Sequence, residues 1–326
     1  MLSRVADSLF WLGRYTERAE NYARFIDVNF NLSLDLPPGI EEQWDPLLQA
    51  TGGKEQYIEL FGEEITRANA ILFLGFDERN LNSIYNSVKF ARENARIVRE
   101  SIPKETWEVL NDLHYYVEEA KDKKIWKKED PKDCFKYIKS QIQLLNGIAY
   151  DNVPRTQGWY FSKLGQFLER ADKTSRILDV KYHFLLPSLD DVGSPLDFLH
   201  WVALLKSVSG FNAYRRIYGI IKPESIVDYL VLNRFFPRSV LFCLQNIEDC
   251  LHEISGSKQG YSNMAEKAIG NMRSDLEFAD VNDIFNDGLH EYLDNIQLKL
   301  NNISDLIYDQ YFKIRPNFTE EIQIQE

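Results

Sequence analysis

The chain has 326 residues, of which 44% are hydrophobic and 13% aromatic, so it is too hydrophobic to be disordered and long enough for roughly two units of ~150 residues. A net charge of −12 argues against a nucleic-acid-binding protein, and the three cysteines form no CxxC pair and no disulfide framework. No secretory signal and no stretch of about 20 apolar residues is present, so we expect a cytoplasmic protein that does not cross a membrane.

Hydrophobic residues recur near the helical period of 3.6 along almost the whole chain. The first predicted helix begins near Ser3 and is closed by Pro37-Pro38. Further helices are expected at about 54–74, 81–100, 104–121, 132–149, 156–184, 196–207, 211–219, 224–233, 238–254, 261–278 and 282–312. Because no segment shows the sustained two-residue alternation of a strand, the sequence predicts an all-α protein.

Two of these helices, the first and the one at 156–184, contain a similar segment. "LGRYTERAENYARFIDV" (12–28) returns 152 residues later as "LGQFLERADKTSRILDV" (164–180), with eight of the 17 positions identical. Three more blocks follow in the same order at offsets of 156 to 158, the clearest being "WDPLLQATGGKEQYIELFG" (44–62) against "WVALLKSVSGFNAYRRIYG" (201–219). We therefore predict an internal duplication into residues 1–152 and 153–326, two fused bundles of about six helices each related by a pseudo-twofold.

The repeated helix carries one polar stripe at helical spacing. In the first copy the stripe consists of Arg14, Glu17, Arg18, Asn21 and Arg24. In the second copy it consists of Gln166, Glu169, Arg170, Lys173 and Arg176. Gln166 therefore leaves the second stripe one cation weaker.

Two interpretations of the stripe stay open at this point. In the structural one, the two helices meet near the pseudo-dyad, Glu17 pairs with Arg170 and Glu169 with Arg18, and Gly13 and Gly165 permit the close approach. In the functional one, the stripe lines a polar pocket in which arginines bind a carboxylate or a phosphate bidentately. Both can hold at once.

Two further segments could bind anions. "FARENARIVRE" (90–100) places Arg92, Arg96 and Arg99 on one helical stripe with Glu93 beside them, although ion pairing along a solvated helix explains the same pattern. "FPRSV" (236–240) is typical of a helix that begins with proline, with Arg238 in its first turn. An anion could bind at this helix terminus, although capping of the helix alone explains the same pattern.

The sequence lacks the motifs typical of nucleotide-binding proteins, serine hydrolases and di-iron proteins. The sequence has no GxxxxGK[ST], no GxGxxG after a strand and no GxSxG, and its five histidines form no Glu-x-x-His pair of the type used by di-iron bundles. We therefore expect no cofactor and no metal site, and no residue is identified as catalytic.

The blocks above resemble the alpha-E family, all-helical bacterial proteins named for a Glu-Arg motif. The resemblance is carried by "MLSRVADSLFWLGRYTERAENYAR" (1–24), "SIYNSVKFARENAR" (83–96), "GWYFSKLGQFLERADKTSRILD" (158–179), "WVALLKSVSGFNAYRR" (201–216) and "FPRSV". It implies a companion of circularly permuted ATP-grasp proteins, often with transglutaminase-like proteases nearby, in ATP-dependent peptide synthesis or tagging.

Three functions are compatible with these observations. The first is a non-catalytic accessory or scaffold subunit of an ATP-grasp-type ligase, which binds an acidic or phosphorylated partner through its arginine-rich faces. The second is an enzyme that acts on the ligase's peptide product, with Glu17 or Glu169 as acid/base beside Arg92 and Arg96; it requires an open cleft and a raised carboxyl pKa. The third is a sensor of a small anionic ligand.

Overall fold

The computed structural model describes residues 1–35, 42–184, 194–257 and 260–313. All regular structure within them is helical, which confirms the all-α fold class. The α-helices before residue 153 are α1 (Ser3–Asp35), α2 (Asp45–Ala50), α3 (Lys54–Phe61), α4 (Arg67–Gly75), α5 (Ile84–Ile97), α6 (Lys104–Asp122) and α7 (Lys132–Asn152). Those after it are α8 (Gln157–Phe184), α9 (Pro195–Ser207), α10 (Phe211–Tyr218), α11 (Pro223–Val227), α12 (Val240–Ser255), α13 (Met264–Glu277), α14 (Val281–Asp287) and α15 (Leu289–Ile307).

Several predicted helices are interrupted in the structure. The expected helix at 54–74 is two helices, because the chain turns at Gly62, whose φ of 82° favours glycine, and restarts behind Thr66, which caps α4 by accepting from the Asn69 amide. The expected helix at 282–312 breaks in the same way at Gly288, with φ of 95°. The short helix α2 was not anticipated as a separate element. These breaks explain why the described residues before the predicted 152/153 boundary, and those after it, each hold more than about six helices.

The helix near "FPRSV" begins later than expected. Ser239 is the N-cap of α12 and its hydroxyl accepts from the Phe242 amide, so Pro237 and Arg238 precede the helix instead of forming its first turn. The Arg238 side chain is thereby free to turn away from the helix terminus.

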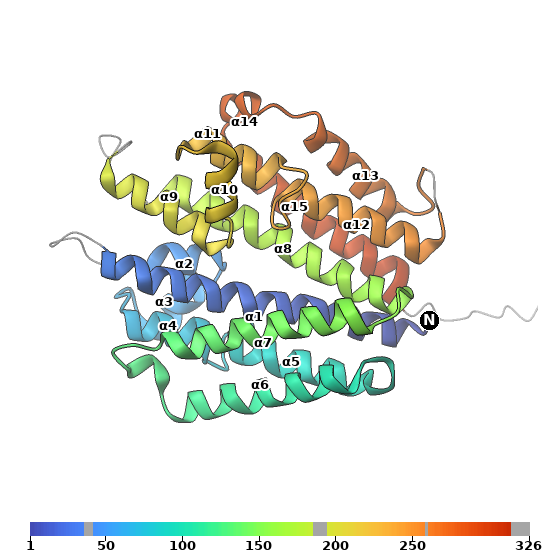
Figure 1. The fold of residues 1–326 in the computed structure, drawn as a ribbon, viewed down its shortest axis with the longest axis horizontal. Helices are drawn as coiled ribbons and strands as arrows, with labels where there is room; N and C mark the ends of the chain where they lie inside the picture. Colours follow the sequence, from blue (N-terminus) through green and yellow to red (C-terminus); the bar gives the residue numbers. More distant parts are fainter. Residues whose placement is uncertain (36–41, 185–193, 258–259, 314–326) are drawn as a thin grey trace, which may run out of the picture.

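The long helices α1 and α8 lie at the centre of the molecule and run parallel to each other (Figure 1). At their start, the amino group of Met1 donates to Gln157 Oε1 over 3.2 Å. Further along, Glu17 contacts Arg170. Early residues of one helix contact early residues of the other, and later residues contact later ones. The two helices therefore point in the same direction.

The other helices surround this pair in corresponding arrangements. Helices α5 and α7 pack on α1 and are joined by α6, whereas α12 and α15 pack on α8 and are joined by α13 (Figure 1). The shorter helices cross over: α2 packs on α8, and α9 packs on α1. The residues on either side of the predicted 152/153 boundary are therefore in extensive contact.

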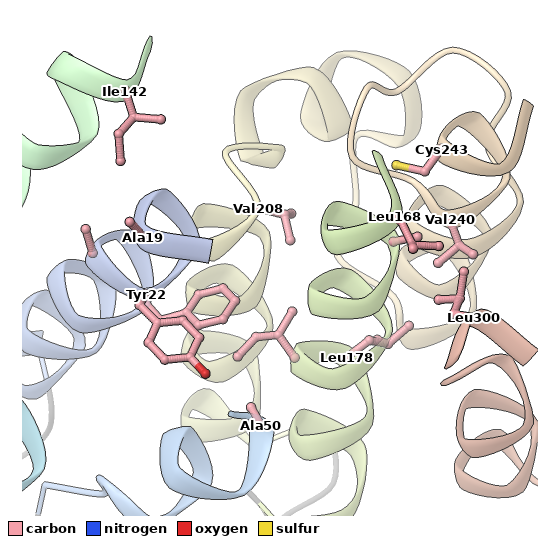
Figure 2. Close-up of a cluster of buried hydrophobic side chains, with 14 of the residues drawn as sticks. Ala19, Tyr22, Ala50, Ile142, Leu168, Leu178, Val208, Val240, Cys243 and Leu300 are labelled. Atoms are coloured by element: carbon pink, nitrogen blue, oxygen red, sulfur yellow. The ribbon is translucent and has the colours of Figure 1, made fainter. Parts of the chain in front are cut away.

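The apolar core runs through all of these interfaces. Figure 2 shows side chains from α1, α8, α12 and α15 in one buried cluster, among them Tyr22, Leu168, Cys243 and Leu300. Burying such side chains is the main source of folding free energy. None of the helices in the described ranges has the length and apolarity that crossing a bilayer requires.

Candidate functional site

The two central helices touch backbone to backbone at a pair of glycines. A Cβ atom added to Gly13 of α1 would lie 2.0 Å from the carbonyl oxygen of Ser162 in α8. A Cβ added to Gly165 of α8 would lie 2.1 Å from the carbonyl oxygen of Phe10 in α1. Only glycine fits at either position, as the sequence predicted. This contact sets the spacing at which the charged side chains of the next turn meet.

Glu169 of α8 is surrounded by cations, two of them from α1. Its carboxylate accepts from Arg14 Nε at 2.9 Å and from Arg18 Nε and Nη2 at 2.7 and 3.0 Å. Lys173, one turn further along α8, lies 3.5 Å from the same carboxylate. The side chain of Glu169 is 0% exposed, so all of its charge is balanced inside the protein.

Glu17 of α1 has the reciprocal environment. Its carboxylate accepts from Arg170 Nε and Nη2 at 3.0 and 2.8 Å and from Arg238 Nη1 at 2.7 Å. Asn21 and Gln166 complete the shell at 3.1 and 3.3 Å. Its side chain is also 0% exposed. The predicted pairs Glu17–Arg170 and Glu169–Arg18 are therefore both confirmed.

Two more pairs extend this arrangement along the helices. Arg24 pairs with Glu20 of α1, which also accepts from Arg238 at 3.1 Å. Arg176 pairs with Asp172 of α8 at 2.8 Å. We call the whole set the ER cluster; it comprises Arg14, Glu17, Arg18, Glu20, Arg24, Glu169, Arg170, Asp172, Lys173, Arg176 and Arg238.

Two members of the ER cluster, Glu20 and Asp172, were not among the residues predicted from the sequence. The sequence did contain a pattern that could have identified them. Each lies four residues before an arginine of the stripe, and side chains at this spacing meet on a helix surface. Their inclusion leaves seven cations facing four carboxylates in the ER cluster.

The protonation states in the ER cluster are set by these contacts. Burial alone raises a carboxyl pKa, but the arginines around Glu17 and Glu169 outweigh it and hold the pKa of both groups well below the usual 4.5. The pKa of Arg24 falls to about 10, because the guanidinium is buried and lies near Arg238. Neither glutamate meets the requirements of a general acid or base, an open cleft and a raised pKa.

The predicted anion-binding residues of α5 lie elsewhere. Arg92 donates to Asn111 of α6 at 2.9 Å, and Arg96 donates to Glu93 at 2.9 Å. The guanidinium of Arg92 lies over the Trp107 ring, with 5.4 Å to its centroid. Arg92 thus faces α6, whereas Arg96 is exposed and pairs within α5 with Glu93, which also accepts from Arg92. The acid/base hypothesis placed them beside Glu17 or Glu169, and that placement is wrong.

No three His, Cys, Asp or Glu side chains in the described part of the chain come together in a way that could hold a metal ion. The three cysteines are buried. Burial raises the pKa of Cys243 to about 12, which disfavours the nucleophilic thiolate.

Comparison with known proteins places this architecture in a family. The uncharacterized proteins Mb2597 of Mycobacterium bovis and MT2643 of Mycobacterium tuberculosis are each 24% identical to the chain over 337 residues, and Rv2567 of M. tuberculosis is 23% identical. Each alignment covers 93% of this chain and 36% of the relative, so the chain spans about a third of their length. No solved structure matches the chain significantly. Residues 1–312 match the Alpha-E family, described as "a predicted alpha-helical domain with a conserved ER motif", and the chain belongs to that family.

Proposed function

We propose that the chain is a non-catalytic accessory subunit that works beside an ATP-grasp-type peptide ligase. The observation that carries the non-catalytic role is the state of the ER cluster, in which both central glutamates are buried, ionised and held by two or more cations. The partner class rests on the family resemblance. The relatives, which extend well beyond the aligned region, fit a unit that acts next to further domains.

Within this proposal, the ER cluster is a structural clamp. Arg14, Arg18, Arg170 and Arg238 are only 12–14% exposed, and the strong bidentate geometry of an arginine–carboxylate pair is already satisfied inside the protein. Buried pairs of this kind specify register between elements. The clamp holds α1 and α8 in a single relative position and so supports a rigid surface for a partner.

The surface that we assign to an acidic or phosphorylated partner is the outer face of α5. The side chain of Arg96 is 65% exposed, unlike the arginines of the ER cluster. Arg92, on the same helix, and Arg99, two residues beyond its end, flank it, and the guanidinium of each lies over the Trp107 ring of α6 at 5.4 and 5.5 Å. Stacking on an aromatic ring orders an arginine without consuming its N–H donors.

We further propose that the two halves, residues 1–152 and 153–326, arose by internal duplication and are related by a pseudo-twofold along α1 and α8. The paired glycines and the paired glutamates support this. The contacts of Gly13 and Arg18 with α8 have counterparts in those of Gly165 and Arg170 with α1, at the same offset of 152. In an experimental structure, the two halves should superpose by a twofold rotation.

A co-purification experiment tests the accessory role. The chain is co-expressed with an ATP-grasp-type ligase of the same genome, and the complex should survive gel filtration. The double variant Arg96→Glu, Arg99→Glu should weaken it, whereas the control Lys299→Glu, a half-exposed charge reversal on α15, should not. Turnover of ATP or peptide by the isolated chain would refute the non-catalytic role, and equal binding by both variants would refute the α5 surface.

A further inference from the structure

A cavity of about 270 Å³ lies beside the start of α1 and α8, where α7 ends and α6 begins. In Figure 1 this is the end of the bundle marked by the N-terminus. Most of its wall is apolar, with Leu12, Ile102, Val153 and Trp159 among the lining side chains. A cavity of this composition favours a hydrocarbon or aromatic group.

Lys163 of α8 provides the charged side chain of the wall, which Met1 also lines. Its ammonium donates to Gln166 Oε1 at 2.8 Å, and no carboxylate of the described residues lies within ion-pair distance of it. An ammonium has three N–H donors, so two are left for a ligand. Burial, reinforced by the nearby Arg170, lowers the pKa of Lys163 to about 8, which is the signature of a cation that lacks a counter-charge.

Thr106 of α6 adds a second polar group to the same wall. Its Oγ1 atom is buried and has no hydrogen-bond partner among the residues that the structure describes. Buried hydroxyls are nearly always hydrogen-bonded, because leaving one unpaired costs free energy. An acceptor atom inside the cavity would satisfy both Thr106 and Lys163.

At this cavity the two similar helix segments carry different residue types. The position equivalent to Lys163 in the first copy is Trp11, which stacks on Tyr15 with 5.2 Å between ring centroids and lies under Arg14. The position equivalent to Arg14 is Gln166. In the second copy a lysine and its hydrogen-bonding glutamine thus replace a tryptophan and an arginine, and the change introduces an ammonium into an apolar cavity.

We propose that this cavity binds a small apolar carboxylate. The carboxylate pairs with the ammonium of Lys163 and accepts from the hydroxyl of Thr106, while the apolar wall surrounds the rest of the molecule. Since a cavity of about 150 Å³ admits benzene, the present one has room for a phenyl ring with a short chain. Such a group occurs in a free aryl acid and in the C-terminal residue of a peptide. The inference does not depend on the accessory role proposed above.

Isothermal titration with 3-phenylpropionate tests the proposal, with 3-phenylpropanamide as the neutral analogue. The acid should bind at least about tenfold more tightly than the amide, as expected for hydrogen bonds to charged groups. The second arm uses N-acetyl-Gly-Phe with a free C-terminal carboxylate, and its C-terminal amide as the control. If the peptide carboxylate binds more tightly than 3-phenylpropionate, the natural ligand is the C-terminus of a peptide. If 3-phenylpropionate binds more tightly, the natural ligand is a free acid.

Three variants locate the site. Lys163→Met keeps the length of the side chain and removes its charge, so it should weaken binding of the acid about tenfold or more and leave the amide unaffected. Thr106→Val should weaken binding of the acid to a smaller degree, and Ala149→Phe should abolish it by filling the cavity. Lys299→Met, which changes a lysine of another cavity, is the control. Melting temperatures confirm that each variant is folded.

The pH dependence gives an independent readout. The charged neighbours of Lys163 are Arg155, Arg170 and Glu17, together with the thiol of Cys250, whose pKa is raised to about 12. Affinity for the acid should therefore fall as the pH rises through about 8 and Lys163 loses its proton. The fall should be absent in Lys163→Met, which keeps the other charged groups and the Met1 terminus at the cavity. Equal affinity for acid and amide, unchanged binding by Lys163→Met, or no binding of any probe would overturn the proposal.

Discussion

Arg238 occupies the place on Glu17 that Arg14 occupies on Glu169, although the two arginines come from different parts of the fold. Arg14 is on α1 and donates to Glu169 at 2.9 Å, whereas Arg238 belongs to the loop before α12 and donates to Glu17 at 2.7 Å. The stripe residue that corresponds to Arg14 is Gln166, a neutral side chain. Arg238 thus supplies the second arginine that the second copy of the stripe lacks.

We therefore expect Arg238 to contribute more to the free energy of unfolding than Arg234, the other arginine of the same loop. Arg238→Gln should lower the free energy of unfolding by roughly 1.5–3 kcal/mol, since a hydrogen bond to a buried charge is lost. Adding Gln166→Arg should recover part of the loss. Urea denaturation measures both, and Arg234→Gln, a half-exposed arginine four residues earlier, should change stability by less than about 0.5 kcal/mol. Equal effects of the two single variants would contradict the exchange.

The glycine contact between α1 and α8 predicts a strong dependence on side-chain size. Gly13→Ala and Gly165→Ala should each destabilise the protein by about 1–3 kcal/mol or more, because the new Cβ collides with backbone and the helices must separate. Gly147→Ala is the matched control: this glycine lies in α7, and a Cβ added to it would meet no atom within 4 Å. It should raise stability by about 0.4–1 kcal/mol. If all three substitutions behaved alike, the close contact would not exist in solution.

The reciprocal pairs predict non-additive mutations. Glu17→Gln and Arg170→Gln should each cost roughly 3–5 kcal/mol, since each leaves a buried charge without its partner. The double variant should cost less than the sum, with a coupling of about 1–3 kcal/mol. The half-exposed pair Glu93–Arg96 on α5 should show a coupling of about 0–1 kcal/mol. Chemical denaturation of both cycles gives the comparison.

The lowered carboxyl pKa values predict acid sensitivity. Glu17 and Glu169 bind protons near pH 4.5 when unfolded and only at much lower pH when folded, so they stabilise the fold above pH 4.5 and lose this contribution as the pH falls through and below that value. Glu17→Gln should therefore be less stable than the parent protein at pH 7, and the difference should shrink at low pH. Thermal denaturation between pH 3 and 7 checks this. A constant difference would place the carboxyl pKa near its usual value.

Local periodicity determined much of the architecture in advance. The spacing of apolar residues predicted the helices. The doubled "LGxxxERA" offered the glycine contact and the pairs Glu17–Arg170 and Glu169–Arg18 as one of two interpretations, and the structure shows that contact and those pairs. The helix breaks at Gly62 and Gly288 were missed, because a glycine within a periodic pattern does not by itself show whether its φ is positive. The alternative acid/base hypothesis placed Arg92 and Arg96 beside Glu17 or Glu169. In the structure Arg92 donates to Asn111 of α6 and Arg96 pairs with Glu93 within α5.

The sequence by itself determined the all-helical fold class and the repeated charged helix, because these depend on spacing within a helix or on the likeness of two segments. Whether the charged stripe forms carboxylate–arginine pairs or lines a pocket depends on how the two helices pack, and the sequence left both interpretations open. Only the tertiary structure decided that Arg238 completes the environment of Glu17, that α2 and α9 cross to the opposite central helix, and that Lys163 lines an apolar cavity with Thr106. The Arg238–Glu17 contact joins residues 221 positions apart. The geometry of all three features depends on how loops and helices pack, which no local pattern encodes.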